Sequence, residues 1–384
     1  MTEFSTMTPT PSAAAASTPA GNPQRFVFTG SGSEYFKIWI VNVLLTIVTL
    51  GIYSAWAKVR RLRYFYNNTR FAGSSFDFHG SPIAILKGRI IAVLLILLIN
   101  VPILGLIVLL AYLLALPWLL YRSLRFHLSN TTWRNLRFAF LGDAKGAYAA
   151  LLLPIGIVVA AAAVSGLAMV VAPFLGVALM ILTVLSFYAI GPYLQYRMRR
   201  YYTAGARAGT SEFGLHIGVG QYYLVYVVAV GYMMALGAVA SVLIALSVGV
   251  DVATIAMKGD MPVSKLVAVA IMVAGFYVAM LAVGPLIIAM LQNTVWRGTS
   301  LAGQRFHSDL AVPNFMLNWL GLTLLTIITL GLYRPFAAVA LAKLRIEAMS
   351  WTGSADDLVA VLRDGSQRAV GSEVADLMDV DIAL

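Results

Sequence analysis

The stretch that decides how the fold is interpreted is Leu44-Leu45-Thr46-Ile47-Val48-Thr49-Leu50-Gly51-Ile52-Tyr53. Nearly the same sequence returns as Leu324-Leu325-Thr326-Ile327-Ile328-Thr329-Leu330-Gly331-Leu332-Tyr333. Each copy is apolar and is interrupted by Thr-Leu-Gly, and basic residues from Lys58 to Arg63 follow the first copy. Two copies in a chain of 384 residues indicate an internal repeat, which has to be identified before any single helix.

The composition is that of a polytopic membrane protein. Hydrophobic residues make up 60% and charged residues 11%, against roughly 45–50% and about 25% in soluble domains. The mean hydropathy is +0.84. The chain has no cysteine, which excludes disulfides, thiolate catalysis and Cys-ligated metals.

The net charge of +11 is divided unevenly along the chain. Of the 16 acidic residues, 7 follow Trp351, so the last segment is acidic and the rest is strongly basic. A basic balance can indicate nucleic-acid binding. In a membrane protein, however, basic residues beside apolar spans usually report orientation and contact with anionic lipid. We therefore expect the lipid bilayer, with anionic phospholipid, and no nucleic acid as partner.

Five repeat units can be traced from a short aromatic pattern. Phe26-Val27-Phe28, Phe76-Asp77-Phe78 and Phe138-Ala139-Phe140 each precede a Gly, and looser copies lie near Phe213 and Phe306. Each pattern predicts a short strand or turn, and each is followed by an apolar run and, in four units, a basic end. The predicted organisation is a disordered tail (1–24), a membrane domain (25–350) with units of about 25–70, 71–135, 136–207, 208–298 and 299–350, and an acidic soluble tail (351–384).

The three middle units predict helical hairpins. Ile90 to Tyr121 is 32 residues without charge, which as one helix would measure about 48 Å against a hydrocarbon core of about 30 Å. Both ends of this run are basic, so a fold-back near Asn100 puts them on one side. Residues 58–89, 122–145, 197–212 and 297–309 carry net charges of +6, +4, +3 and +1. Positive segments stay in the cytoplasm, so the basic ends of all three hairpins are predicted on that side. Three hairpins of two spans each give six spans.

The first and last units leave two topologies open. Ile38 to Ala57 is 20 uncharged residues, enough for one straight span. That alternative gives eight spans with both termini outside. The repeat instead favours short re-entrant hairpins that turn at the two Thr-Leu-Gly breaks, giving six full spans and both termini inside. The fold class predicted is an all-α polytopic membrane protein of helical-hairpin repeats with short cytoplasmic aromatic strands or turns.

Two sets of residues are candidates for function. Polar and turn-forming residues at the breaks could line a pathway, or could make interhelical hydrogen bonds of about 1 kcal/mol: Asn42, Thr49, Gly51, Asn318, Thr329 and Gly331. Basic residues could contact an anionic lipid or solute, or could anchor the chain at the interface: Lys58, Arg60, Arg61, Arg63, Arg197, Arg199 and Arg200. No catalytic motif and no metal-binding pair among the four histidines stands out, so we expect no enzyme and no cofactor or metal.

Several segments resemble the YjgN family of bacterial inner-membrane proteins. They are Phe28 to Phe36, Thr49 to Arg60, Leu86-Lys87-Gly88-Arg89, Leu116-Pro117-Trp118 with Arg122 to Phe126, and Asn130 to Arg134. The likeness covers roughly residues 25–350 and leaves out the acidic tail. It implies a multi-pass inner-membrane protein of uncharacterised function, without catalytic residues to transfer. Some members are found beside a zinc metallopeptidase, which implies a partner protein of that kind.

Two classes of function remain open at this point. The internal repeats and broken helices favour a transporter or channel for a small anionic solute. The absence of ionisable residues at membrane depth favours either a passive pathway or a non-transporting scaffold that binds anionic lipid or a partner protein such as a membrane-associated peptidase.

Overall fold

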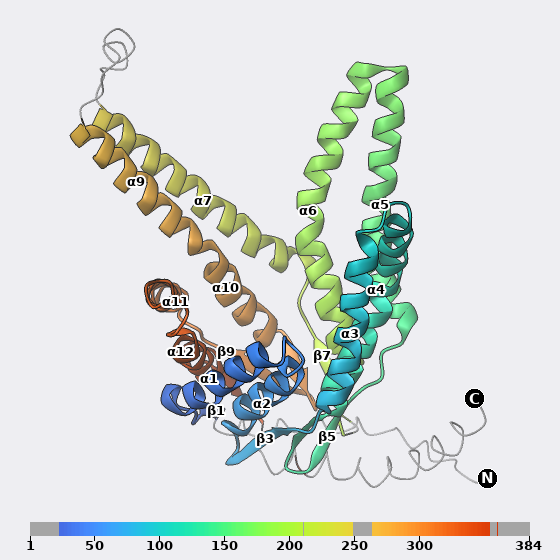
Figure 1. Cartoon of the computed structure of the whole chain (residues 1–384), viewed down its shortest axis with the longest axis vertical. Coiled ribbons are helices and arrows are strands. Elements are labelled where there is room, and N and C mark those ends of the chain that lie inside the picture. Colours follow the sequence, from blue (N-terminus) through green and yellow to red (C-terminus); the bar gives the residue numbers. More distant parts are fainter. Residues whose placement is uncertain (1–22, 210, 249–262, 354–358, 360–384) are drawn as a thin grey trace, which may run out of the picture.

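Helical hairpins alternate with short strands in the computed structural model, which describes residues 23–209, 211–248, 263–353 and 359 (Figure 1). The first unit consists of β1 (Gln24–Phe28), α1 (Gly32–Val48), α2 (Ser54–Asn67) and β2 (Thr69–Phe71). The second unit consists of β3 (Ser74–Phe78), α3 (Pro82–Ile99), α4 (Leu104–Ser129) and β4 (Thr131–Trp133). The third unit consists of β5 (Leu136–Phe140), α5 (Ala144–Val171), α6 (Pro173–Gly205) and β6 (Ala206–Ala208). The fourth unit consists of β7 (Ser211–Leu215), α7 (Val219–Val248), α9 (Val263–Leu281), α10 (Val283–Arg297) and β8 (Thr299–Leu301). The fifth unit consists of β9 (Gln304–Ser308), α11 (Val312–Ile328), α12 (Arg334–Glu347) and β10 (Met349–Trp351).

The ten described strands close into an antiparallel barrel in the order β1-β10-β9-β8-β7-β6-β5-β4-β3-β2. Within each unit the first strand pairs with the last, and tight turns join successive units. Ala72-Gly73 and Ala302-Gly303 have positive φ at both turn residues, as two-residue type I′ hairpins require. The pairing of Gln24 with Trp351 closes the ring between β1 and β10. Closure leaves no exposed sheet edge, so strands this short can persist.

The barrel core follows from the side-chain alternation of its strands. The third residue of every long strand is a phenylalanine: Phe26, Phe76, Phe138, Phe213 and Phe306. Each is directly opposite the third residue of a short strand, in the order Phe71, Trp133, Ala208, Leu301 and Trp351. Seven of these ten side chains form one buried cluster, and the other three pack against it. The aromatic pattern in the sequence therefore marks the inside of the barrel.

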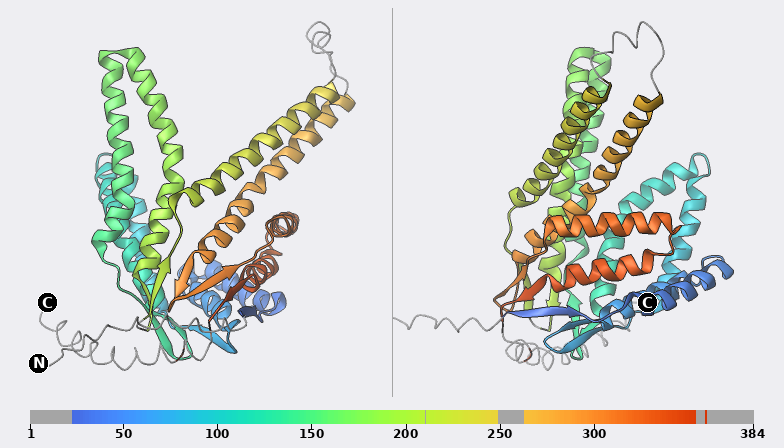
Figure 2. Two further views of the ribbon diagram at one scale, coloured as in Figure 1. Left: turned by 180° about the vertical axis from the view of Figure 1, so that it is seen from behind. Right: turned by 90° about the vertical axis from the view of Figure 1, so that its left-hand side faces the viewer.

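Six helices in the described part of the chain are long and apolar enough to cross a membrane, with mean hydropathies of 2.0 to 2.4. Their apolar side chains are largely exposed, as expected for surfaces that face lipid. The three long hairpins leave the same end of the barrel and fan apart, so that the barrel lies at one end of the molecule and their tips at the other (Figures 1 and 2). The polytopic helical architecture is confirmed.

The first and fifth units form short hairpins in place of straight helices. α1 and α11 have 17 residues each, or about 25 Å, which is less than the hydrocarbon thickness of about 30 Å. α1 ends at Val48, and the chain reverses at Leu50 (φ 48°) and Gly51 (φ 93°). The second break repeats these angles at Leu330 (φ 51°) and Gly331 (φ 92°). The eight-span alternative requires an unbroken helix from Ile38 to Ala57, and the structure has a reversal there instead.

The all-α prediction is wrong in one respect, because the short strands form a closed barrel. The aromatic pattern does not reveal the three-residue strands, whose inward residues belong to the core. Trp351, which the prediction assigned to the acidic tail, is the last residue of β10 and is fully buried. Residues 1–22 of the predicted N-terminal tail, the loop with Asp251 and Asp260, and nearly all of the predicted C-terminal tail lie outside the described residues.

Candidate functional site

A cavity of about 630 Å³ opens between α1, α2, α3 and α12. Four cationic side chains line it: Lys58 and Arg61 of α2, Arg89 of α3 and Arg334 at the start of α12. None of the described residues that line it is an Asp or Glu. We call this cavity the basic pocket. It is the site that the structure supports best for a ligand of negative charge.

Each cation reaches the basic pocket for a local reason. Lys58 and Arg61 are three residues apart and therefore share one face of α2. Arg89 arrives from α3, where its Nη1 donates to the hydroxyl of Ser54. Arg334 is the first residue of α12, three positions after the Gly331 break. The reversal of the chain at Gly331 thus delivers this side chain to the pocket.

The electrostatics show that the positive charges are not neutralised by the protein. Burial lowers the pKa of the Lys58 ammonium, and the neighbouring charges of Arg89 and Arg61 lower it further. The pKa of the Tyr35 phenol is raised by burial, while Arg61 and Arg334 act in the opposite direction. None of the ion pairs found among the described residues involves these four cations. An anion would therefore relieve mutual repulsion here.

Asn42 adds a polar group to the wall of the pocket. Its side chain is only 7% exposed, and its Oδ1 is buried without a hydrogen-bond partner. One turn further along α1, the hydroxyl of Thr46 donates to the Asn42 carbonyl at 2.6 Å. A buried polar atom without a partner costs about 1–3 kcal/mol, so this amide is an unsatisfied polar group at the wall of the pocket.

The other basic residues predicted from the sequence lie elsewhere. Arg60 and Arg63 line a separate cavity on the other side of α2, together with Lys37. Arg63 also donates from Nε to the Phe78 carbonyl at 3.0 Å. The second predicted cluster is in the third unit: Arg197 donates to the Ala149 carbonyl at 3.0 Å, Arg199 lines the barrel interior and Arg200 is exposed. The structure does not bring the two clusters into one site.

The Thr-Leu-Gly residues serve the chain reversal. Thr49 donates to the Leu45 carbonyl and accepts from the Tyr53 amide, and Thr329 makes the same two bonds in the second break. Gly51 and Gly331 supply the positive φ that an L-residue adopts at a cost. Asn318 donates to Asn314 within α11 and does not line the basic pocket. Of the predicted pathway residues, Asn42 is the one that lines the basic pocket.

A family model described as "Bacterial protein of unknown function (DUF898)" matches residues 23–377. The chain belongs to this family. It is 26% identical to the inner membrane protein YjgN of Salmonella typhimurium strain LT2, over 86% of this chain and 89% of that protein. It is 34% identical to YjgN of Escherichia coli O157:H7 and of strain K12, in matches that span about a third of this chain and of each relative (32%). No solved structure matches the chain.

These relatives and the six long apolar helices make this DUF898 protein a multi-pass protein of the bacterial inner membrane. Two residues of its basic pocket were missed from the sequence. In the sequence, Arg89 stands out only as one of the basic residues before the charge-free run that begins at Ile90. Arg334 occupies the place in the fifth unit that Ser54 occupies in the first, three residues after the glycine of the break. An alignment of the two units could have indicated Arg334, whereas the contact of Arg89 with Ser54 is seen only in the structure.

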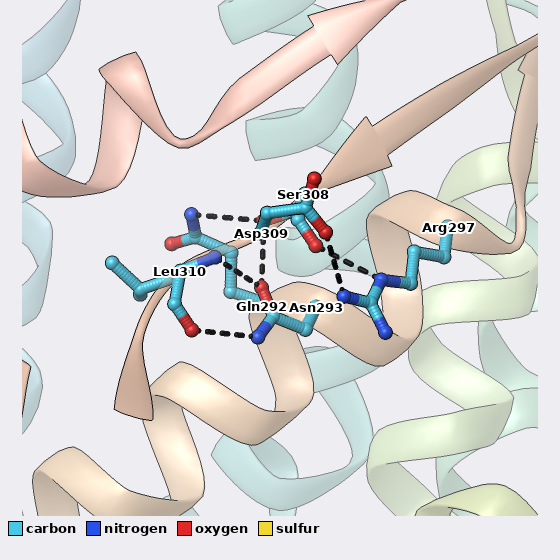
Figure 3. A network of polar contacts seen from close by, with 6 residues as sticks. All are labelled: Gln292, Asn293, Arg297, Ser308, Asp309 and Leu310. Atoms are coloured by element: carbon cyan, nitrogen blue, oxygen red, sulfur yellow. Dashed lines mark hydrogen bonds and ion pairs between the residues drawn. The ribbon is translucent and has the colours of Figure 1, made fainter. Parts of the chain in front are cut away.

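A second polar cluster in this DUF898 protein is structural. Asn293 and Arg297 of α10 bind the segment Ser308–Leu310, which runs from the last residue of β9 towards α11 (Figure 3). Gln292 exchanges hydrogen bonds with Arg345, donating to its carbonyl at 2.8 Å and accepting from its Nε at 2.7 Å. These contacts fasten the fourth unit to the fifth.

Proposed function

We propose that this protein binds the phosphate-bearing head group of an anionic phospholipid in the basic pocket and acts as a non-transporting membrane scaffold. The observation that supports the proposal is the convergence of Lys58, Arg61, Arg89 and Arg334 on one cavity without an acidic residue among its described lining. Basic pockets between helices on the cytoplasmic side of a membrane are suited to phosphate head groups.

The walls of the pocket favour a lipid over a soluble anion. Trp39, Val43 and Ile47 of α1 line it beside the cations, so one ligand could place its phosphate among the charges and its apolar part along α1. The hairpin itself has an apolar tip, because Leu50 and Leu330 at the two breaks are each 94% exposed. Such tips are suited to insertion into the bilayer. In this proposal the two short hairpins are re-entrant, and the lipid enters the pocket sideways from the membrane.

Transport of a small anionic solute is the second candidate, because Asn42 and Thr46 make the wall next to the first break polar. Both candidates use the same cations. They differ in whether the anion is held or crosses the membrane, so an experiment has to measure both lipid retention and flux.

The test compares two double variants that remove the same charge. Arg61→Gln with Arg89→Gln alters the basic pocket, and Lys37→Gln with Arg60→Gln alters the cavity on the other side of α2. Native mass spectrometry of the full chain, released from bilayers of phosphatidylglycerol and phosphatidylcholine, reports which lipid is retained. At about 1 kcal/mol per basic residue, we expect the pocket variant to lose about 30-fold in preference for phosphatidylglycerol and the control to lose little.

Equal losses in the two variants would refute the lipid site. Uptake of inorganic phosphate into proteoliposomes is measured alongside. If phosphate uptake requires Arg61 and Arg89, transport replaces the scaffold role as the proposed function. Thermal unfolding of each variant in the same detergent shows whether a loss of lipid preference follows from misfolding.

A further inference from the structure

The barrel contains a cavity of about 270 Å³ that is separate from the basic pocket. Aromatic side chains from the barrel strands line most of it, and side chains from α2, α4, α6 and α10 complete it at the end where the helices leave the barrel. We call it the barrel chamber. The inference drawn from it does not rest on the function proposed above.

The chamber exists because one of the five units lacks a large inward side chain. At the third position of the short strands, four units have Phe71, Trp133, Leu301 and Trp351, whereas the third unit has Ala208. Ala206, at the first position of the same strand, is also small and also lines the chamber. A packed core fills its space to near-crystalline density, so the missing bulk at β6 leaves room.

The five inward phenylalanines close one end of the chamber. Phe26, Phe76, Phe138, Phe213 and Phe306 form a ring in which the centroids of neighbouring side chains are 6.4 or 6.5 Å apart. The planes of neighbouring phenyl rings meet at 14° to 33°. If the rings stood parallel to the barrel axis, five of them would meet at about 72°. The side chains therefore lie nearly flat across the barrel. A regular ring of this size leaves an opening of about 4 Å once the carbon radii are subtracted.

Arg199 is the one charged side chain among the described residues that line the chamber. Its guanidinium carbon lies 5.4 Å from the centroid of Tyr202 and 5.7 Å from that of Trp296. Its Nε is buried without a hydrogen-bond partner. The indole Nε1 of Trp351, a side chain only 1% exposed, is likewise unpaired. A buried N–H donor without a partner costs free energy, so an acceptor oxygen placed beside the Arg199 guanidinium would be favourable.

We propose that the barrel chamber binds a medium-chain fatty carboxylate. The planar guanidinium fork of Arg199 matches a carboxylate, and a single cation matches a single negative charge. The volume corresponds to about nine water-sized groups, which suits an acyl chain of about eight to ten carbons among the aromatic side chains. The narrow phenylalanine ring blocks the far end, so the ligand enters from the end that the helices frame, where the bilayer supplies it.

The decisive variant restores the pattern of the other units. Ala208→Phe places a phenylalanine where the first unit has Phe71, so it fills the chamber without introducing a foreign side chain. Ala139→Phe is the matched control: it lies on the neighbouring strand β5, beside Phe138, and alternation directs it to the outer face of the sheet. The probe is 10-bromodecanoate, whose bromine quenches the fluorescence of the chamber residues Trp133, Trp296 and Trp351 in full-length protein in nanodiscs.

We expect saturable quenching in the wild type and in Ala139→Phe, and at least a tenfold weaker Kd in Ala208→Phe. Arg199→Gln should weaken decanoate binding at least tenfold and leave decanol binding unchanged, as measured by displacement of the probe. Wild-type affinity in Ala208→Phe would overturn the chamber as the site. Equal effects of Arg199→Gln on decanoate and decanol would overturn the carboxylate assignment. If Arg199→Gln fails to fold, the pair of alanine variants still decides the site.

Discussion

Replacing Gly331 by alanine tests whether the reversal of the fifth unit requires a left-handed backbone. Gly331 has φ +92°, and a Cβ built on it meets no atom within 4 Å. Steric crowding therefore contributes nothing, and the expected cost is the conformational one of about 1–2 kcal/mol for an L-residue in the left-handed region. Gly321 is the matched control, because it lies in α11 of the same hairpin, also with open space around its Cβ. Gly321→Ala should stabilise the protein by about 0.5–1 kcal/mol, since alanine favours a helix interior over glycine.

The assay is denaturant-induced unfolding of both variants in the same detergent, with the wild type alongside. The two free energies of unfolding should differ by about 2 kcal/mol, with Gly331→Ala the less stable. Because Arg334 reaches the basic pocket through this reversal, Gly331→Ala should also reduce the retention of phosphatidylglycerol, and Gly321→Ala should not. Equal stabilities in the two variants would refute the argument that a left-handed residue shapes the break.

Two further predictions concern the pocket and the topology. Binding of phosphatidylglycerol should be constant at low pH and should weaken as the pH rises through the lowered pKa of Lys58, because a bound phosphate favours the protonated ammonium while Arg61, Arg89 and Arg334 stay charged. Vesicle binding measured against pH should lose this dependence in the Lys58→Met variant. A pH profile that this substitution leaves unchanged would contradict the assignment to Lys58. A reporter fused after Leu384 should be active in the cytoplasm alone, because β10 pairs with β1 at the basic end of the molecule and basic segments stay in the cytoplasm. A reporter signal confined to the periplasm would exclude this orientation.

The helical part of the fold could be predicted because its signals are long. A charge-free run of 32 residues with basic ends admits few arrangements other than a hairpin. The reversals at Gly51 and Gly331 could be predicted because the same Thr-Leu-Gly text appears twice. Here the repeat supplied a comparison that one copy alone does not offer.

The barrel could not be predicted, since its short strands have only three residues each. Thr69–Phe71 and Thr131–Trp133 are too brief for an alternating pattern to be distinguished from a turn. Their partners lie on the far side of a helical hairpin, and the closing pair Gln24 and Trp351 spans almost the whole described chain. Such pairing depends on contacts between distant segments, which local sequence patterns do not encode.

The candidate site was predictable only where its residues share one helix. Lys58 and Arg61 could be assigned to one face of α2 from their spacing. The spacing also separates Arg60 and Arg63 from them, although all four were taken as one cluster. Arg89 and Arg334 come from other units, and their convergence depends on how the hairpins pack around the barrel.

Both proposed sites include a position at which the repeat units differ. The five inward phenylalanines are kept in every unit, which is expected for positions that close the barrel. Ala208 departs from the large residues at the equivalent position in the other four units, and a chamber results. Arg334 replaces the serine of the first unit, and a fourth cation enters the basic pocket. Residues that break a local rule are expected at functional sites, so the positions at which the units differ, rather than those that they share, are where ligand binding should be sought.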